Sequence, residues 1–223
     1  MIKYNDIEIV WTGHDGFKFI GMDDKHNRKI IYVDPFRLSN SHHESHDADL
    51  VLVSHNHYDH LSMDDLKHVI NKQTLIVGAE ECGEQLGKID SNQVRKVRPN
   101  ESLEIQGIKL ETVPAYNTNK SFHPKEDGKV GFIFTLGNQR IYHAGDTDLI
   151  NEMESLNPDI ALVPVSGTYV MTSDEAARAI NELIKPKRLA IPMHYGEIVG
   201  ELKDANKFRE LVTACETKIL ERD

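Results

Sequence analysis

Leu50-Val-Leu-Val-Ser-His-Asn-His-Tyr-Asp-His60 is the stretch of this 223-residue sequence that decides both the fold and the site. Its first four residues, 50–53, form a continuous apolar run, which is typical of a strand buried on both faces. The next segment, Ser62-Met-Asp-Asp65, has the form of a capping box and predicts a helix to about Ile70. Between the strand and the helix lie four side chains of the types that bind metals: His55, His57, Asp59 and His60.

The spacing of these four side chains indicates how they could share metal ions. If the extended chain continues past the apolar run, His55 and His57 lie on the same side, because side chains alternate with a period of two. One ion could then reach both. Asp59 and His60 fall in the turn, where the backbone changes direction and can present them to a second position. Imidazole nitrogens and a carboxylate are ligands that zinc takes, and the spacing is compatible with two adjacent ions.

Two later segments carry single ligand-type side chains directly after a predicted strand. Asp146 follows the strand predicted over 140–143, and His194 follows the one over 188–191. Functional groups gather on loops that are held by the ends of a rigid sheet. Alone, Asp146 could be a helix N-cap and His194 a hydrogen-bonded core histidine. Together with the first cluster, both are better explained as metal ligands.

The remainder of the chain predicts one domain over residues 1–223, long enough to bury roughly three-quarters of its unfolded surface. Mixed strands and helices in both halves indicate two packed sheets covered on the outside by helices. The β-rich runs at 7–11, 17–22 and 29–33 predict an antiparallel meander, and those at 94–97, 103–105, 109–114, 130–136 and 140–143 a second sheet. Further helices are predicted over 80–86, 149–154, from Thr172, and over 203–214, with strands over 75–77, 160–165 and 218–220.

Composition excludes several classes of protein. Lys and Arg total 26 against 36 Asp and Glu, a net charge of −10, which opposes binding to nucleic acid. No apolar run approaches the roughly 18 residues that would span a membrane. The start of the sequence has no basic stretch followed by an apolar one, so we expect a cytoplasmic protein. Cys82 and Cys215 are too few for a disulfide framework. A small-molecule substrate is expected, and homo-oligomerisation stays open.

The assembled residues resemble the metallo-β-lactamase superfamily. The His-x-His-x-Asp-His pattern from His55 to His60, the later Asp146 and His194, and the early strand-end Asp34 all match that family. Further segments at 115–117, 122–124, 142–147 and 164–172 resemble its small single-domain hydrolase branch, near the ascorbate-phosphate lactonases and the N-acyl phosphatidylethanolamine phospholipases D. The resemblance implies an α/β (α+β) fold, the αββα four-layer sandwich, with a dinuclear metal site at one edge.

The resemblance also implies a role for each matching residue. Asp34 is expected to orient a ligand histidine rather than to bind metal. The family's third first-site histidine is missing, and Asn117 stands near its place. His123 could fill that place, Asn117 could lend its amide oxygen, or the site could hold one tight and one weak ion. The implied ligands are His55 and His57 for the first ion, Asp59, His60 and His194 for the second, and Asp146 as the bridge.

The chemistry expected of such a site is hydrolysis. Two cations lower the pKa of a bound water, so that hydroxide can attack an ester, lactone or phosphodiester at pH 7. Asp59 could orient that nucleophile, and Tyr195 could donate a hydrogen bond to the substrate oxygen. Zinc is the expected metal, with manganese, iron and nickel as alternatives.

Two points stay open at this stage. A non-catalytic, metal-stabilised binding or sensor protein is the alternative to a hydrolase, and its only support is the missing third histidine. The histidines without partners at ligand spacing are expected to be structural or exposed; they are His14, His26, His68 and His143.

Overall fold

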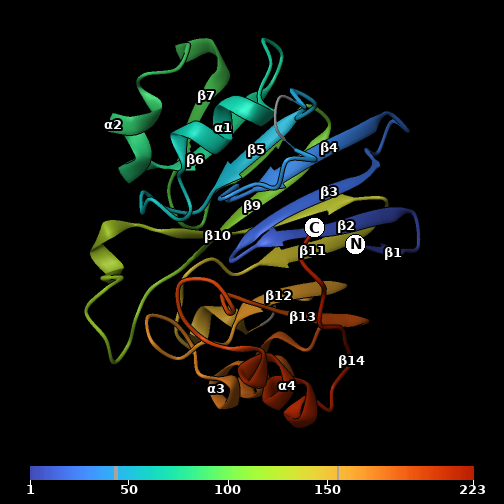
Figure 1. The fold of residues 1–223 in the computed structure, drawn as a ribbon, viewed down its shortest axis with the longest axis vertical. Coiled ribbons are helices and arrows are strands. Elements are labelled where there is room, and N and C mark those ends of the chain that lie inside the picture. Colours follow the sequence, from blue (N-terminus) through green and yellow to red (C-terminus); the bar gives the residue numbers. More distant parts are fainter. Residues whose placement is uncertain (43–44, 155) are drawn as a thin grey trace.

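The strands pair almost in the order of the sequence and build two sheets (Figure 1). The computed structural model describes residues 1–42, 45–154 and 156–223. In spatial order, the first sheet contains β1 (Ile2–Tyr4), β2 (Ile7–Gly13), β3 (Gly16–Met22), β4 (Arg28–Val33), β5 (Leu50–Val53), β6 (Leu75–Ala79) and β7 (Val94–Val97). The second contains β14 (Glu216–Thr217), β13 (Leu189–Met193), β12 (Ile160–Pro164), β11 (Gln139–His143), β10 (Val130–Leu136), β9 (Ile108–Pro114) and β8 (Ser102–Ile105).

The two sheets repeat one topology. In the first, β1 to β4 are joined by antiparallel pairs and β4 to β7 by parallel pairs. In the second, β8 to β11 are antiparallel and β11 to β14 are parallel. The predicted meander over the first strands is confirmed. Each half of the chain therefore ends in parallel strands, and most of the ligand-type residues lie in the loops that follow these strands.

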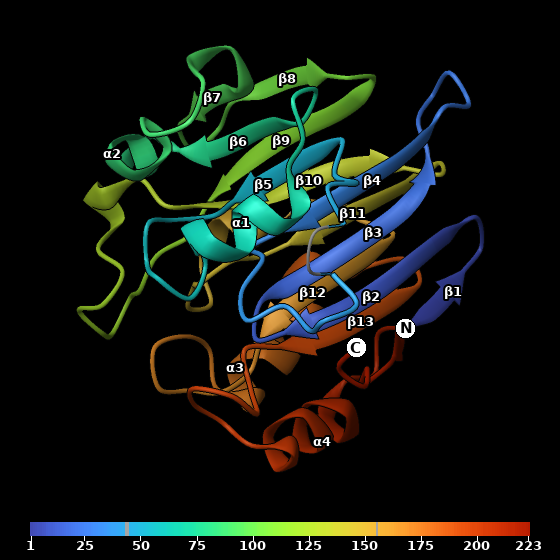
Figure 2. The same cartoon turned by 45° about the horizontal axis from the view of Figure 1, so that its top comes forward.

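Helices cover the outer faces of both sheets, as Figures 1 and 2 show. They are α1 (Met63–Val69), α2 (Gly83–Leu86), α3 (Ser173–Arg178) and α4 (Leu202–Leu211), with 3-10 turns η1 (Glu80–Cys82), η2 (Ser91–Gln93), η3 (Lys125–Asp127) and η4 (Asn151–Met153) and the π-helical η5 (Ala179–Ile184). α2 lies against β6, whereas α3 and α4 lie against β12 and β13. This arrangement confirms the αββα sandwich. No helix in the described parts of the chain is long and apolar enough to cross a bilayer.

The helix starts predicted at Ser62 and Thr172 are confirmed. Ser62 caps α1 by accepting a hydrogen bond from the backbone N–H of Asp65. Thr172 and Glu175 form a complete capping box at the start of α3. The helix predicted over 149–154 is wrong, because only the 3-10 turn η4 forms there. The last strand lies at 216–217 rather than 218–220, since its pairing with β13 sets its position.

Aromatic side chains join the two sheets into one core. Phe19 of β3 and Phe134 of β10 are fully buried, and their ring centroids are 5.1 Å apart in an edge-to-face contact. Phe17, also on β3, contacts His143 at the end of β11 with centroids 5.8 Å apart. Packing between the sheets therefore fixes how the strand ends of one half of the chain face those of the other.

Replacing Phe134 with Ala tests this packing. We expect the free energy of unfolding to fall by about 3–5 kcal/mol, because a fully buried ring leaves a cavity between the sheets. Urea denaturation at fixed metal content measures the change. Leu202→Ala is the control, since that side chain is 58% exposed and its loss should change stability by less than about 0.5 kcal/mol. Equal losses in the two variants would contradict the inter-sheet packing.

Candidate metal centre

Strand ends from both sheets converge on one cluster of histidines and carboxylates. β5 is followed by the His55–His60 segment, β11 by Asp146, and β13 directly by His194. His123 comes from the connection between β9 and β10. Most of these side chains are buried, with His57 and Asp59 the partly exposed members. The structure thus brings all seven ligand candidates predicted from the sequence to one edge of the sandwich.

His55, His57 and His123 form one triad. Each offers a nitrogen, and the three nitrogens lie within 4.8 Å of one another. His55 Nε2 and His57 Nδ1 are 3.0 Å apart, so the two histidines do share one side of the chain after β5. This grouping could hold one ion.

Asn117 holds His123 in place. The Asn117 Oδ1 accepts a hydrogen bond from the backbone N–H of His123 at 3.0 Å, and the Asn117 backbone N–H donates to the His123 carbonyl at 2.8 Å. The Asn117 Nδ2 donates to the Tyr169 carbonyl at 2.8 Å. Both the oxygen and the nitrogen of the Asn117 side chain are therefore hydrogen-bonded to backbone groups. His123, six residues later, is the side chain that enters the cluster.

Asp146 lies at the middle of the cluster. Its Oδ2 is 3.2 Å from His123 Nε2 and 3.3 Å from His194 Nε2, and its Oδ1 is 3.4 Å from His60 Nε2. Burial raises the pKa of Asp146, but the adjacent His194 and His60 outweigh this and hold it well below its usual value. Asp146 is therefore an ionised carboxylate, with one oxygen turned toward histidines of each half of the chain.

The far ring nitrogens of the histidines are fixed by other groups. Asp34 Oδ2 lies 2.9 Å from His60 Nδ1, and Ser166 Oγ lies 2.8 Å from His194 Nδ1. The opposite nitrogens, the Nε2 atoms of His60, His123 and His194, are buried; they face the Asp146 carboxylate at 3.2–3.4 Å, and none makes a well-formed hydrogen bond within the described residues. Buried polar atoms without partners are destabilising. A cation in their midst would satisfy all three, so the donor set fits a divalent metal site.

Asp59 lies at the open side of the cluster. Its Oδ2 is 4.0 Å from His60 Nε2, and its side chain is 14% exposed. Burial raises the pKa of Asp59, but the contact with His14 and the charge of His60 lower it to about 2. Asp59 is thus a carboxylate that solvent or a substrate can reach.

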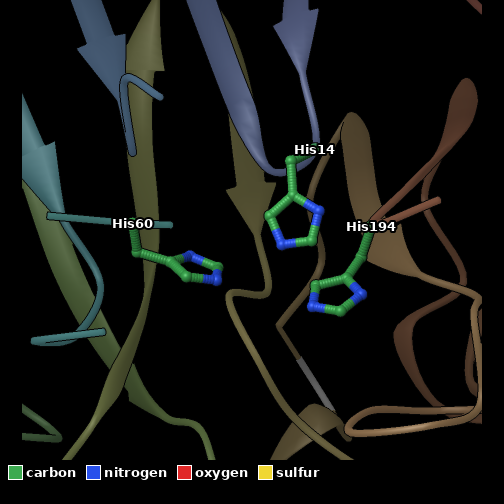
Figure 3. A group of neighbouring side chains, drawn as sticks. All are labelled: His14, His60 and His194. Atoms are coloured by element: carbon green, nitrogen blue, oxygen red, sulfur yellow. The ribbon is translucent and has the colours of Figure 1, made fainter. Parts of the chain in front are cut away.

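His14 is one of two members of this cluster that the sequence did not predict; the other is Asp15, which groups with Asp146 and His194. His14 lies in the turn between β2 and β3, is fully buried, and places its Nε2 3.2 Å from Asp59 Oδ2. Its ring centroid is 4.1 Å from that of His194 (Figure 3). No other histidine stands at a ligand spacing from His14 in the sequence. The feature that could have indicated it is the tight turn Gly13-His-Asp-Gly16, which joins two predicted strands.

Tyr195 packs against the core rather than along the cavity. Its ring stacks on Trp11 with centroids 4.9 Å apart, and it is almost fully buried. Burial raises the pKa of its hydroxyl to about 12. Tyr195 is not one of the side chains that line the cavity over the cluster. A hydrogen bond from Tyr195 to the substrate stays a prediction.

A cavity of about 490 Å³ opens over the cluster. Its floor contains His57, Asp59, His123 and Asp146, and its walls contain Asn56, Tyr58, Phe122, Tyr169 and Ile198. Phe122 and Tyr169 meet edge to face, with centroids 4.7 Å apart. A hollow of about 530 Å³ on another part of the surface shares no residue with the cluster; it is lined by Lys3, Asp6, Glu8, residues 20–24, His26, Arg28 and residues 137–138. The cavity that leads to the cluster is therefore separate from this hollow, and its walls are largely apolar.

Comparisons with known proteins agree with this architecture. The family model described as the beta-lactamase superfamily domain matches residues 8–194. A UPF0173 metal-dependent hydrolase of Thermoplasma acidophilum is 34% identical over 224 residues, which cover 96% of this chain and 95% of the relative. The counterpart of Thermoplasma volcanium is 30% identical over 225 residues, with 96% and 95% covered.

Solved structures give the same result. A protein of Parabacteroides distasonis described as a metal-dependent hydrolase superimposes with a TM-score of 0.80 at 27% identity, covering 97% of this chain and 94% of its own. Igni18, a metallo hydrolase of Ignicoccus hospitalis, has the same fold, with a TM-score of 0.75 at 22% identity and 96% and 95% covered. The chain belongs to the metallo-β-lactamase superfamily and, within it, to the UPF0173 metal-dependent hydrolases.

Proposed function

We propose that this protein uses two divalent cations, zinc foremost, to hydrolyse a small ester or lactone. The observation that carries the proposal is the position of Asp146, whose ionised carboxylate lies 3.2–3.4 Å from imidazole nitrogens of His60, His123 and His194. A carboxylate between two groups of histidine nitrogens is the arrangement expected of a bridge between two ions.

Bound there, the cations would lower the pKa of a water and polarise the substrate oxygen. Residues of the chain would orient the attacking water and the ligand histidines. Asp59, ionised and open to the cavity, is placed to accept a hydrogen bond from the attacking water and so to orient it. Asp34 fixes the His60 ring through its Nδ1, which keeps the opposite nitrogen directed at the cluster.

The walls of the cavity favour an uncharged substrate. Tyr58, Phe122, Tyr169 and Ile198 offer apolar surface, whereas no Lys or Arg in the described parts of the chain lines the cavity. A phosphodiester would bring a charge that meets no cationic side chain there. An ester or lactone with a small apolar group would bury that group against the walls. These features support esters and lactones ahead of phosphodiesters.

The position of His123 bears on the alternative of a non-catalytic sensor. That alternative depends on a missing third histidine in the first group. His123 Nε2 lies 3.2 Å from Asp146, and its ring lies beside those of His55 and His57. The cavity also opens directly onto the carboxylates. Both observations favour a hydrolase over a sensor.

Asp146→Ala tests the proposed chemistry. We expect kcat/KM on a panel of small nitrophenyl esters and lactones to fall at least about 100-fold, because several kcal/mol of transition-state stabilisation depend on the cations that Asp146 would bridge. Chelation should abolish the wild-type activity, and zinc should restore it. His26→Ala is the control, since His26 is an exposed turn residue, and it should keep full activity. Wild-type turnover by Asp146→Ala, or turnover after chelation, would overturn the proposal.

Asn117→Ala tests the first metal position separately. Loss of the side-chain clamp on His123 should weaken the affinity for one of the two zinc ions by about 10–100-fold. Competition with a chromophoric chelator measures this affinity. The matched control is Asn119→Ala on the same loop, which is exposed and should bind both ions as the wild type does. An unchanged affinity in Asn117→Ala would show that His123 is not a ligand or needs no clamp.

A further inference from the structure

We propose that Glu81 is a positioning residue for the first metal position, and that the buried cation of Lys129 holds it in place. The proposal rests on the dinuclear site proposed above and concerns the group that contains His55 and His57. Glu81 is in none of the ligand groups that the described residues form, and it is not among the side chains that line the cavity. It acts instead through the backbone between the two histidines, at Asn56.

Asn56 stands between the two ligand histidines, and side chains hold both of its backbone polar groups. Its N–H donates a hydrogen bond to Glu81 Oε1 at 3.1 Å, and its carbonyl oxygen accepts one from Gln85 Nε2 at 3.3 Å. The two bonds fix the two planar peptide groups that flank Asn56, one shared with His55 and the other with His57. They therefore set the directions in which the two imidazole side chains leave the chain.

The strand pairing does not reach this point of the backbone. β5 ends at Val53, and its last paired residue faces Gly78 of β6. The backbone of Asn56 thus lies outside the ladder that holds the residues before it. Hydrogen bonds from side chains take over this function in the segment that carries the ligands.

Lys129 holds the Glu81 carboxylate in this position. Its ammonium nitrogen lies 2.9 Å from both Glu81 oxygens and 3.2 Å from Asp127 Oδ2. The Lys129 side chain is 3% exposed and that of Glu81 is 15% exposed. A buried ion pair contributes little net stability, because the desolvation of both charges offsets their attraction. The pair is therefore better explained by the geometry that it fixes than by the stability that it adds.

Glu81 and Lys129 approach the ligand segment from two different sheets. Glu81 lies in η1, directly after β6, which pairs in parallel with β5. Lys129 directly precedes β10 of the second sheet, where the Val130 N–H donates to the Ser54 carbonyl at 3.1 Å. The ion pair thus joins both sheets beside the first metal position.

The second group of ligands has separate supports. Asp34 bonds to the His60 ring, and Ser166 bonds to the His194 ring. Within the described residues, neither Asp34 nor Ser166 makes a hydrogen bond or an ion pair with the buried pair. Loss of the bond to Asn56 should therefore weaken one ion and spare the other.

A rival explanation is that the ion pair only joins the sheets. Two double variants separate these roles, because both remove the buried charges and they differ only in whether residue 81 can accept a hydrogen bond. Glu81→Gln with Lys129→Met keeps an oxygen for the Asn56 N–H, whereas Glu81→Met with Lys129→Met does not. Replacing a buried ion pair by groups of similar volume is often neutral for stability, so both variants should fold.

The test is zinc titration of the metal-free protein by chelator competition. We expect two bound ions in the wild type. In the Glu81→Met double variant the affinity for one ion should fall about 10–100-fold, with the other unchanged. The Glu81→Gln double variant should bind both ions almost as the wild type does. Glu84→Ala is the control, because Glu84 is an exposed carboxylate in α2, directly after η1, and its loss should change neither affinity.

Cobalt(II) in place of zinc gives a second readout, because its visible absorption depends on the geometry of the ligands. The absorption of one of the two ions should change in the Glu81→Met double variant and stay as in the wild type in the Glu81→Gln double variant. Equal spectra in the two double variants would contradict a positioning role for Glu81.

The zinc titration has further outcomes that overturn the proposal. Wild-type affinity in the Glu81→Met double variant, an equal loss for both ions, or an equal loss in the two double variants overturns the role of Glu81 and leaves the dinuclear site intact. Failure of the wild type itself to bind two ions overturns the dinuclear site. If the Glu81→Met double variant does not fold, as judged by circular dichroism, Gln85→Ala removes the other bond to Asn56. It should weaken the same ion by up to about 10-fold, and wild-type affinity in it overturns the proposal.

Discussion

The Asp146 carboxylate among its imidazoles is the interaction on which the site depends. His60 reaches it from the first sheet, whereas His123 and His194 reach it from the second. Distances of 3.2–3.4 Å hold only if the two sheets keep their relative position, which the aromatic contact between Phe19 and Phe134 helps to fix. The packing of the core between the sheets therefore also determines the geometry of the metal centre.

The protein keeps this cluster at a cost in stability. His14, Asp34 and His194 have positive φ values of 50°, 43° and 60°, and such conformations cost on the order of 1 kcal/mol or more each. Buried imidazole nitrogens without partners add to that cost. Metal binding would satisfy the nitrogens and would therefore stabilise the folded chain. Each of the three residues directly follows a strand, and β2 has a register shift between Trp11 and Gly13 just before His14.

The sequence predicted what is encoded locally. Strand β5, the turn with His55 to His60 and the cap of α1 follow one another within a short stretch, so periodicity and capping rules suffice. Asp146 and His194 were predicted because each follows a strand. His123 stayed one of three options, since its place depends on the clamp by Asn117 and Tyr169. His14 was missed because its partners lie on other strands, and only tertiary pairing brings them together.

Anomalous diffraction at the zinc edge, from crystals of the zinc-loaded protein, is the most direct test of the central claim. We expect two peaks, one on each side of Asp146. One should lie among His55, His57 and His123, and the other among Asp59, His60 and His194. A single peak, or peaks away from Asp146, would contradict a dinuclear site bridged by Asp146.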